Sequence, residues 1–562
     1  MKPILLRALV CTLLCFPASI SADFKKPRLT IIMVVDQFAY SYLRKLSCYL
    51  NHGIKFLMRH GIVYENAQHP HGMPSTGPGH TALSTGCYAK DHGITSNHWA
   101  TPFGKKIACD DDDPKTAAVI NPRGGFYDFG KGPLHIEVDG ISDQFVMSQE
   151  PGSSRVAISL SIKSRAAVCT ANEMGKAIWL DSNTGQFTSS KAYYDQLPSW
   201  LKQFNQQKRL DTITKISWPL FFPRCSKAYN FKYIDNYQYS ARPSIVGKTL
   251  PIDWNSDDPF ELFIRTPAAN QLLFDLALHT IKTHVTRKSC QEMMLWVCLS
   301  PLDMVGHEFG PQSREVIDMI YHLDCQIERF MDSVSEYLKR TDVLYVLTAD
   351  HGVSPIPELL NDDGYSAATR IDYSKVIPQI NDSIKKSLEI DEYISHCLSN
   401  QLFVNEKVWR SLGQEKQEKA LMIIKDTLRY HAGVKKVWTA EELKNSWFDQ
   451  DMLESHFKYQ MYPGRTGRYI IQPFPYCVAD DYGTGTGHRT PYEPDTHVPL
   501  ILYQKHNLES RVIYDKVWTL QLAPSLAHIL HIQRPSACTA HLLPGLIDYD
   551  PITGEVLQTV VL

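Results

Sequence analysis

The stretch Leu29-Thr-Ile-Ile-Met-Val-Val35, followed directly by Asp36, decides the fold of this chain. A continuous apolar run that is rich in β-branched residues predicts a strand covered on both faces. Strands of that kind lie at the centre of a mostly parallel sheet with helices on either side. The sequence therefore predicts an α/β fold in which Asp36 lies at the carboxyl end of a central strand, where such sheets bind ligands.

Further apolar runs have the same character: residues 294–299, 343–348 and 498–503. The first leads through Ser300 into Asp303, the second leads into Asp350 and His351, and the third follows His497. Three carboxylates are therefore expected just beyond the ends of predicted strands, at one edge of the sheet. Apolar residues at helical spacing predict helices over residues 313–338 and 518–532.

Two segments have a different composition. Residues around 185–290 and 375–480 are rich in aromatic residues, Pro and Asn, with short mixed patterns. We interpret both as cap insertions in a single catalytic domain that covers residues 23–562. The predicted fold class is a central, mostly parallel sheet flanked by helices and carrying these inserted caps. The sequence contains no heptad repeat that would predict a coiled-coil interface.

Composition excludes several classes of protein. Hydrophobic residues make up 43% of the 562 residues and charged residues 21%, which is ordinary for a folded protein and excludes disorder of the whole chain. The formal net charge is −2, and no basic block is present, so a nucleic acid polymer is not an expected partner. A protein that binds the phosphates of a nucleic acid polymer needs clustered Lys and Arg side chains.

The N-terminus predicts export. Lys2 and Arg7 flank the start of an apolar run over residues 8–16, and small residues occupy much of 18–22. This pattern is typical of a signal peptide over residues 1–22, and the run is shorter than a membrane span requires. The alternative is a buried N-terminal helix. We expect a secreted or periplasmic protein without a membrane span, in which disulfides are permitted; 11 of the 13 cysteines lie beyond the signal segment.

Candidate metal ligands gather around the predicted strand ends. They are Asp36, Asp303, His307, Asp350, His351 and His488. If their segment is helical, Asp303 and His307 share one face because they are four residues apart. Carboxylate and imidazole ligands in this number suit two Zn²⁺ ions with open positions for a substrate.

A hydroxyl-containing motif forms the second chemical element. In Gly72-Met-Pro-Ser-Thr-Gly-Pro-Gly-His-Thr-Ala-Leu-Ser-Thr-Gly86, Ser75 and Thr76 precede a segment that could begin a helix. A hydroxyl at a helix N-terminus meets free backbone N–H groups and the positive end of the helix dipole, which suits phosphate. The alternative is that Ser75 or Thr76 only caps the helix. The nearby metal-ligand clusters favour a nucleophile.

These residues together resemble the alkaline phosphatase superfamily. The resemblance rests on Asp36, Thr76-Gly-Pro-Gly-His-Thr, Asn97, Asp303-Met-Val-Gly-His307, Asp350-His-Gly352 and Gly487-His488, in that order along the chain. Within the superfamily, the chain most resembles the bacterial phosphate-irrepressible alkaline phosphatases, near the nucleotide pyrophosphatase/phosphodiesterase branch. The similarity extends from about Pro27 to about Ile532.

The resemblance implies a role for each of these residues. Thr76 would be the nucleophile and would form a covalent phosphothreonine. Asp36, Asp350 and His351 would hold one zinc ion beside Thr76. Asp303, His307 and His488 would hold the other. Asn97 would donate a hydrogen bond to a phosphoryl oxygen.

The segment Lys163-Ser-Arg165 favours a monoesterase. In the irrepressible phosphatases that this chain resembles, a Lys-x-Arg at this place contacts the phosphoryl oxygens. A phosphate monoester carries nearly two negative charges, so it gains more from two cationic donors than a diester does. The alternative is that both are solvated surface charges.

The sequence thus predicts an exported, two-zinc phosphomonoesterase that acts on small phosphate monoesters. One alternative is a phosphodiesterase or nucleotide pyrophosphatase with the same metal site. Another is a non-catalytic envelope binding protein, which is disfavoured because none of the ligands is missing. A sulfatase is disfavoured because Cys87 lacks the Cys-x-Pro-x-Arg context of that branch.

Overall fold

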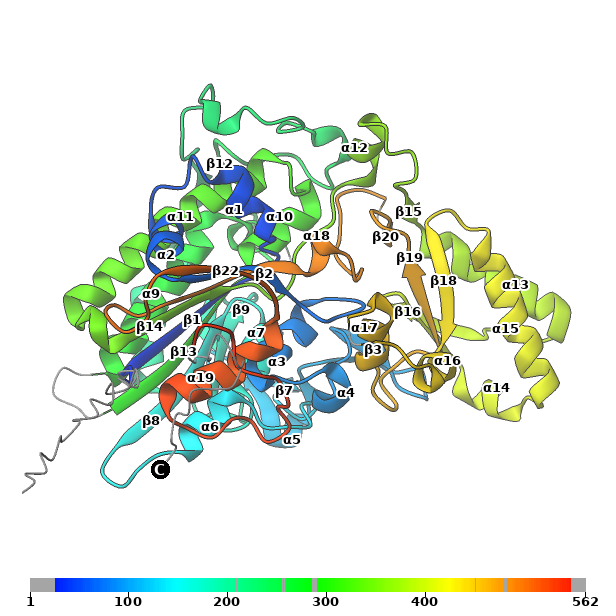
Figure 1. Cartoon of the computed structure of the whole chain (residues 1–562), viewed down its shortest axis with the longest axis horizontal. Coiled ribbons are helices and arrows are strands. Elements are labelled where there is room, and N and C mark those ends of the chain that lie inside the picture. The colour runs from blue at the N-terminus through cyan, green and yellow to red at the C-terminus, as the bar shows by residue number, and fades with distance from the viewer. Residues whose placement is uncertain are drawn as a thin grey trace, which may run out of the picture.

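The structure is a computed structural model that describes residues 26–208, 210–254, 256, 258–285, 291–449, 451–479 and 483–546. The predicted signal peptide, residues 1–22, lies outside the described residues. Two lobes are visible, a large lobe built on a twisted sheet and a smaller lobe with its own sheet (Figure 1). Among the described residues, no helix has the length and apolarity that crossing a membrane requires.

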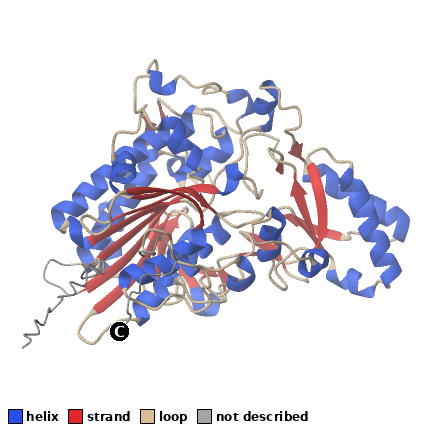
Figure 2. Cartoon of the chain, in the orientation of Figure 1, coloured by secondary structure: helices blue, strands red, loops and turns tan. Residues whose placement is uncertain are grey.

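A nine-stranded sheet organises the large lobe (Figure 2). Its order is β10-β9-β8-β13-β1-β14-β21-β2-β22. The strands are β1 Leu29–Val35, β2 Ile62–Gln68, β8 Ser154–Ser161, β9 Lys176–Asp181, β10 Gln186–Thr188, β13 Gln291–Leu299, β14 Val343–Thr348, β21 His497–Tyr503 and β22 Arg511–Trp518. Five neighbouring strands from β9 to β14 are parallel, whereas β21 is antiparallel to both of its neighbours. The predicted α/β fold with a mostly parallel sheet is confirmed.

The two faces of β1 explain its continuous apolar run. Ile31 and Met33 belong to one hydrophobic core, and Ile32 and Val34 belong to a second core on the other face. Helices that contribute to the first core are α1 Tyr40–Leu46, α2 Gly53–His60, α9 Pro267–His284, α10 Pro301–Phe309 and α11 Arg314–Tyr337. Helices that contribute to the second are α3 Thr76–Thr85, α6 Ile141–Met147, α7 Ser164–Ala171 and α19 Leu522–Leu530. Both faces of the sheet are therefore covered, as a parallel sheet requires.

The small lobe is built on a separate four-stranded sheet. Its strands are β16 Ile394–Leu398, β17 Gln401–Val404, β19 Tyr469–Pro473 and β18 Val434–Thr439, in spatial order. The helices α13 Tyr373–Leu388 and α15 Gln414–Arg429 pack on this sheet over a core of their own (Figure 1). Two short helices, α16 Ala440–Asn445 and α17 Leu453–Tyr459, lie beside it. This lobe falls within the segment for which the sequence predicts the second cap.

Several shorter elements lie around the central sheet. Strands β3 His98–Ala100 and β4 Lys106–Ala108 form a hairpin, and β5 Asp111–Asp112, β6 Ala118–Ile120 and β7 Phe126–Lys131 form a small sheet. Within the first predicted cap, β11 Lys215–Trp218 and β12 Lys248–Pro251 pair with each other, and α8 Ser199–Gln207 packs on α9. Helix α9 itself lies against β8 and β13 of the central sheet.

Candidate metal centre and phosphoryl site

Three carboxylates meet at the carboxyl edge of the central strands. Asp36 follows β1, Asp350 follows β14 by two residues, and Asp303 lies in the first turn of α10, directly after β13. Strands β13, β1 and β14 are neighbours in the sheet, which brings the three side chains together. All three are at most 5% exposed. Burying three anions together is costly unless positive charge accompanies them.

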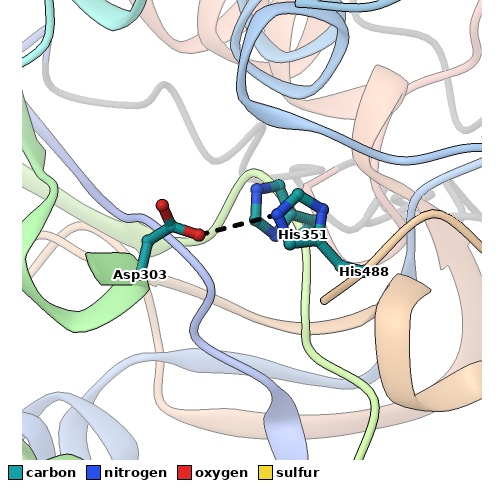
Figure 3. Close-up of side chains that lie close together, drawn as sticks. All are labelled: Asp303, His351 and His488. Atoms are coloured by element: carbon teal, nitrogen blue, oxygen red, sulfur yellow. Dashed lines mark ion pairs between the residues drawn. The ribbon is translucent and has the colours of Figure 1, made fainter. Parts of the chain in front are cut away.

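Three histidines surround these carboxylates. His307 lies one helical turn after Asp303, and its Nε2 is 3.2 Å from Asp303 Oδ1. His351 Nε2 is 3.3 Å from Asp36 Oδ1 and 3.4 Å from Asp350 Oδ2. His488 Nε2 is 3.6 Å from Asp303 Oδ1, and the His351 and His488 rings stack on each other (Figure 3).

The histidine rings are oriented as metal ligands are. The Nδ1 atoms of His307, His351 and His488 each lie 2.9 Å from a backbone carbonyl oxygen, those of Thr486, Gly352 and Pro74. A neutral ring that donates from Nδ1 presents the lone pair of Nε2. Each Nε2 lone pair then faces carboxylate oxygens, an arrangement that a cation between them would stabilise.

Buried atoms without partners converge on the same place. Asp36 Oδ1, Asp350 Oδ2 and His351 Nε2 are buried and have no hydrogen-bond partner among the described residues. Asp36, Asp350 and His351 form one group whose ligand atoms lie within 4.8 Å of one another, and Asp303, His351 and His488 form another. The structure thus holds two groups of side chains that could hold metal ions, and their oxygen and nitrogen donors fit zinc.

The pKa values of the site residues are shifted by burial and by the neighbouring charges. Burial alone would lower the pKa of His351, but the carboxylates of Asp350 and Asp36 raise it to about 9. Burial and the neighbouring His351 lower the pKa of His488 to about 3, so that this ring is neutral and free to bind a metal. Burial and Asp303 oppose ionisation of Asp36, yet Lys163 and His351 hold its pKa below the ordinary value.

The candidate nucleophile begins a helix that points at this cluster. Thr76 is the first residue of α3, and Ser75 precedes it as the N-cap. The Ser75 side chain makes no capping hydrogen bond, and its buried Oγ has no partner among the described residues. The alternative that Ser75 only caps the helix therefore finds no support. Gly79 allows the close approach of α3, because a Cβ at this residue would lie 2.2 Å from the backbone oxygen of Asp350.

Asn97 is tied to the same helix. Its Oδ1 accepts a hydrogen bond of 2.7 Å from the backbone N–H of Gly77, the residue after Thr76. Because Oδ1 is occupied in this way, the Asn97 Nδ2 group is left as a donor. This arrangement is what a hydrogen bond to a phosphoryl oxygen beside Thr76 would require.

The two predicted cations lie at the start of α7. Lys163 Nζ is 2.5 Å from Asp36 Oδ2 and 2.5 Å from Asp303 Oδ2, so it lies between the two groups of carboxylates. Arg165 has a buried Nε without a hydrogen-bond partner, and the described residues supply no ion pair to its guanidinium. The structure thus brings every residue of the predicted site to one region of the large lobe.

Sequence reasoning missed residues that hold the ligands in place. Gln37 adopts φ 66°, donates from Nε2 to Asp303 Oδ1 at 2.8 Å, and donates from its backbone N–H to Asp350 Oδ1 at 3.2 Å. A backbone in the left-handed region is uncommon for a residue other than Gly, and it aims both donors at neighbouring ligands. In the sequence, the only indication of this role is that Gln37 directly follows Asp36.

Asp495 organises the loop that carries His488. Its Oδ2 accepts hydrogen bonds from the backbone N–H groups of Arg489 and Thr490 and from Thr490 Oγ1, and its Oδ1 accepts one from Ser354 Oγ. No pattern in the sequence singles out this residue, because its partners come together only in the folded chain.

Comparison with known proteins gives the class of this site. The family model described as type I phosphodiesterase / nucleotide pyrophosphatase matches residues 30–136 and 170–449, which is more than half of the chain. The chain belongs to this family. With its α/β fold and its similarity to alkaline phosphatases, it is an alkaline phosphatase-type hydrolase of phosphate esters.

Particular relatives span nearly the whole length of the chain. It is 26% identical to alkaline phosphatase PhoV of Synechococcus elongatus, over 95% of this chain and 94% of the relative. It is 25% identical to alkaline phosphatase PafA of Elizabethkingia meningoseptica, over 93% of this chain and 95% of the relative. A crystal structure of wild-type PafA has a TM-score of 0.80, with 22% identity over 92% of this chain and 98% of that one. The fold of the two proteins is therefore the same.

Proposed function

We propose that this chain is an exported phosphomonoesterase that uses two zinc ions and a covalent phosphothreonine at Thr76. The observation that carries the proposal is the position of Lys163, whose Nζ lies between the Asp36 and Asp303 carboxylates. A phosphoryl group held between two metal ions would lie beside this ammonium and the Arg165 guanidinium, whose buried Nε has no hydrogen-bond partner among the described residues. The names of the relatives PhoV and PafA support the same reaction class.

The geometry of the side chains supports the ligand assignment that we propose. Asp36, Asp350 and His351 would hold one ion on the side of α3, since the Asp350 backbone touches that helix at Gly79. The second ion would be held by Asp303, His307 and His488, whose ligand atoms are 3.2 to 3.6 Å apart. When bound, zinc would lower the pKa of a coordinated hydroxyl and stabilise the charge on the leaving oxygen.

The chain's own residues perform the remaining steps. Thr76 attacks phosphorus in line with the leaving alcohol, and the positive end of the α3 dipole favours the negative phosphoryl oxygens. Lys163, Arg165 and Asn97 neutralise or donate to the non-bridging oxygens as charge is redistributed. Water then hydrolyses the phosphothreonine and restores the Thr76 hydroxyl.

A second candidate function is a phosphodiesterase or nucleotide pyrophosphatase. It is favoured by the description of the family model, which names those activities. It requires the same metal site, but an esterified phosphoryl oxygen would gain less from Lys163 and Arg165 than a free one does. Substrate preference therefore distinguishes the two candidates.

The experiment pairs two substrates with two proteins. Zinc-loaded protein is assayed with p-nitrophenyl phosphate and bis-p-nitrophenyl phosphate, and again after Lys163→Ala and Arg165→Ala are combined. We expect the parent protein to have a much higher kcat/KM for the monoester than for the diester. In the double variant, the ratio of these two kcat/KM values should fall by at least about 100-fold. Lys385→Ala, an exposed cation paired with Asp391 in the small lobe, is the control and leaves the preference unchanged. Diester preference in the parent protein would overturn the proposal.

Two further parts of the proposal concern location and architecture. We propose that residues 1–22 direct the chain to a secreted or periplasmic location. We also propose that the segments 185–290 and 375–480 act as caps on one catalytic domain over residues 23–562. Support for the second cap comes from contacts of the small lobe with the loop before α3, where Phe457 packs against Gly72 and Gln460 Oε1 accepts from the Met73 backbone N–H.

A further inference from the structure

Two buried cysteines lie side by side behind the phosphoryl site. Cys109 follows the β3–β4 hairpin, and Cys169 lies on α7, four residues after Arg165. Both are 0% exposed, belong to one small hydrophobic cluster with Ile94 and Trp99, and carry free thiols in the structure. Contact with the Cys169 thiol, together with burial, raises the pKa of Cys109, and the same contact lowers the pKa of Cys169.

The pair lies where three site-bearing elements meet. A Cβ on Gly77 would lie 2.8 Å from Cys109 Sγ, so this sulfur packs directly against the backbone beside Thr76. The Cys109 backbone N–H donates to the Asn97 carbonyl at 3.0 Å. The Cys169 carbonyl accepts from Ser84 Oγ of α3 at 2.8 Å. The two cysteines therefore lie where the loop of Asn97, the helix of Thr76 and the helix capped by Lys163 meet.

We propose that Cys109 and Cys169 form a disulfide in the exported protein, and that this bond fastens the Asn97 loop to α7 behind the nucleophile. Two thiols lose two electrons and two protons as one S–S bond forms. A disulfide of a thiol–disulfide oxidoreductase, or a small-molecule disulfide, accepts them and becomes two thiols. Because both sulfurs are fully buried, the exchange takes place during folding, before the core closes over them.

The disulfide would stabilise the folded chain more than a disulfide that closes a short loop does. It closes a loop of about 60 residues, and longer loops lose more conformational entropy in the unfolded chain when they are closed. It also replaces a contact between two thiols at the junction of α3, α7 and the β3–β4 hairpin by a covalent connection. The inference does not depend on the reaction that the site catalyses.

The first test is the thiol content of the wild-type chain. Protein exported to a bacterial periplasm is unfolded in guanidinium with N-ethylmaleimide and no reductant, then digested and analysed by mass spectrometry. We expect peptides of Cys109 and Cys169 joined, two hydrogens lighter than their sum, and alkylated only after reduction. The exposed Cys48 serves as the internal control and is alkylated at once. Alkylation of Cys109 and Cys169 before reduction would overturn the proposal, as would links of either one to another cysteine.

The second test measures stability without relying on activity. Cys109→Ser, Cys169→Ser and the double variant are expected to share one Tm, about 5 °C or more below the wild type. Wild-type protein refolded with a reductant should have the Tm of the double variant, which the reductant does not change further. Cys48→Ser is the control and keeps the wild-type Tm. Equal Tm values for the wild type and both single variants would contradict the inference.

Discussion

Replacing Gly79 by Ala should separate the nucleophile from the metal centre. The new Cβ would lie 2.2 Å from the Asp350 backbone oxygen and 2.9 Å from its carbonyl carbon. An ordinary C···O contact is about 3.3 Å or longer, so α3 has to retreat by about 1 Å. Asp350 cannot easily give way, because it follows a central strand and its side chain holds other site residues.

The magnitude follows from that displacement. A shift of about 1 Å in a reacting group costs about 100-fold in rate, so we expect kcat on p-nitrophenyl phosphate to fall by about two orders of magnitude. The assay compares Gly79→Ala with Gly413→Ala, where an added Cβ has no neighbour within 4 Å and the backbone φ is −67°. Zinc content and Tm are measured alongside, so that misfolding is recognised. A Gly79→Ala protein within threefold of wild-type kcat would refute the reasoning.

Further predictions concern the metal and the buried histidines. Asp495→Asn removes a hydrogen-bond acceptor from the loop that carries His488. The variant should therefore lose zinc to a chelator at a roughly tenfold lower chelator concentration than the wild type. Equal zinc retention by the two proteins would overturn this role of Asp495. Removing metal with EDTA should lower the Tm and zinc should restore it, because the buried carboxylates then repel one another; an unchanged Tm speaks against a metal centre. Burial, assisted by Lys516, lowers the pKa of His456 to about 4, below its unfolded value, so the stability it contributes is complete above pH 6.5 and is lost as pH falls. His456→Phe should therefore reduce the loss of unfolding free energy between pH 7 and pH 5 by about 2 kcal/mol in urea titrations, and an unaltered pH dependence would contradict this.

The sequence predicted the centre of the fold well, for a physical reason. The apolar run over residues 29–35 is buried on both faces, and the structure has β1 at those bounds. The predicted run over residues 498–503 is also a central strand, but β21 is antiparallel to its neighbours. Burial on both faces gives the same residue pattern in either direction, so the sense of β21 could not be predicted.

The candidate site shows a similar division. Asp303 and His307 meet because they are one helical turn apart, which the sequence alone predicts. By contrast, the pairing of His351 with Asp36, the positive φ of Gln37 and the loop held by Asp495 depend on contacts between distant segments. Such contacts leave no local pattern. The resemblance to a known family indicated which of these residues belong to one site, whereas periodicity and spacing did not.

The choice between two adjacent hydroxyls tests the central claim most directly. Thr76→Ala and Ser75→Ala are compared with zinc-loaded wild-type protein on p-nitrophenyl phosphate, with zinc content measured for each. If Thr76 forms the phosphothreonine, Thr76→Ala loses at least about 1,000-fold in kcat while it retains zinc, and Ser75→Ala stays within about tenfold of the wild type. Undiminished turnover by Thr76→Ala, or an inactive Ser75→Ala protein that binds zinc normally, would contradict the proposed mechanism.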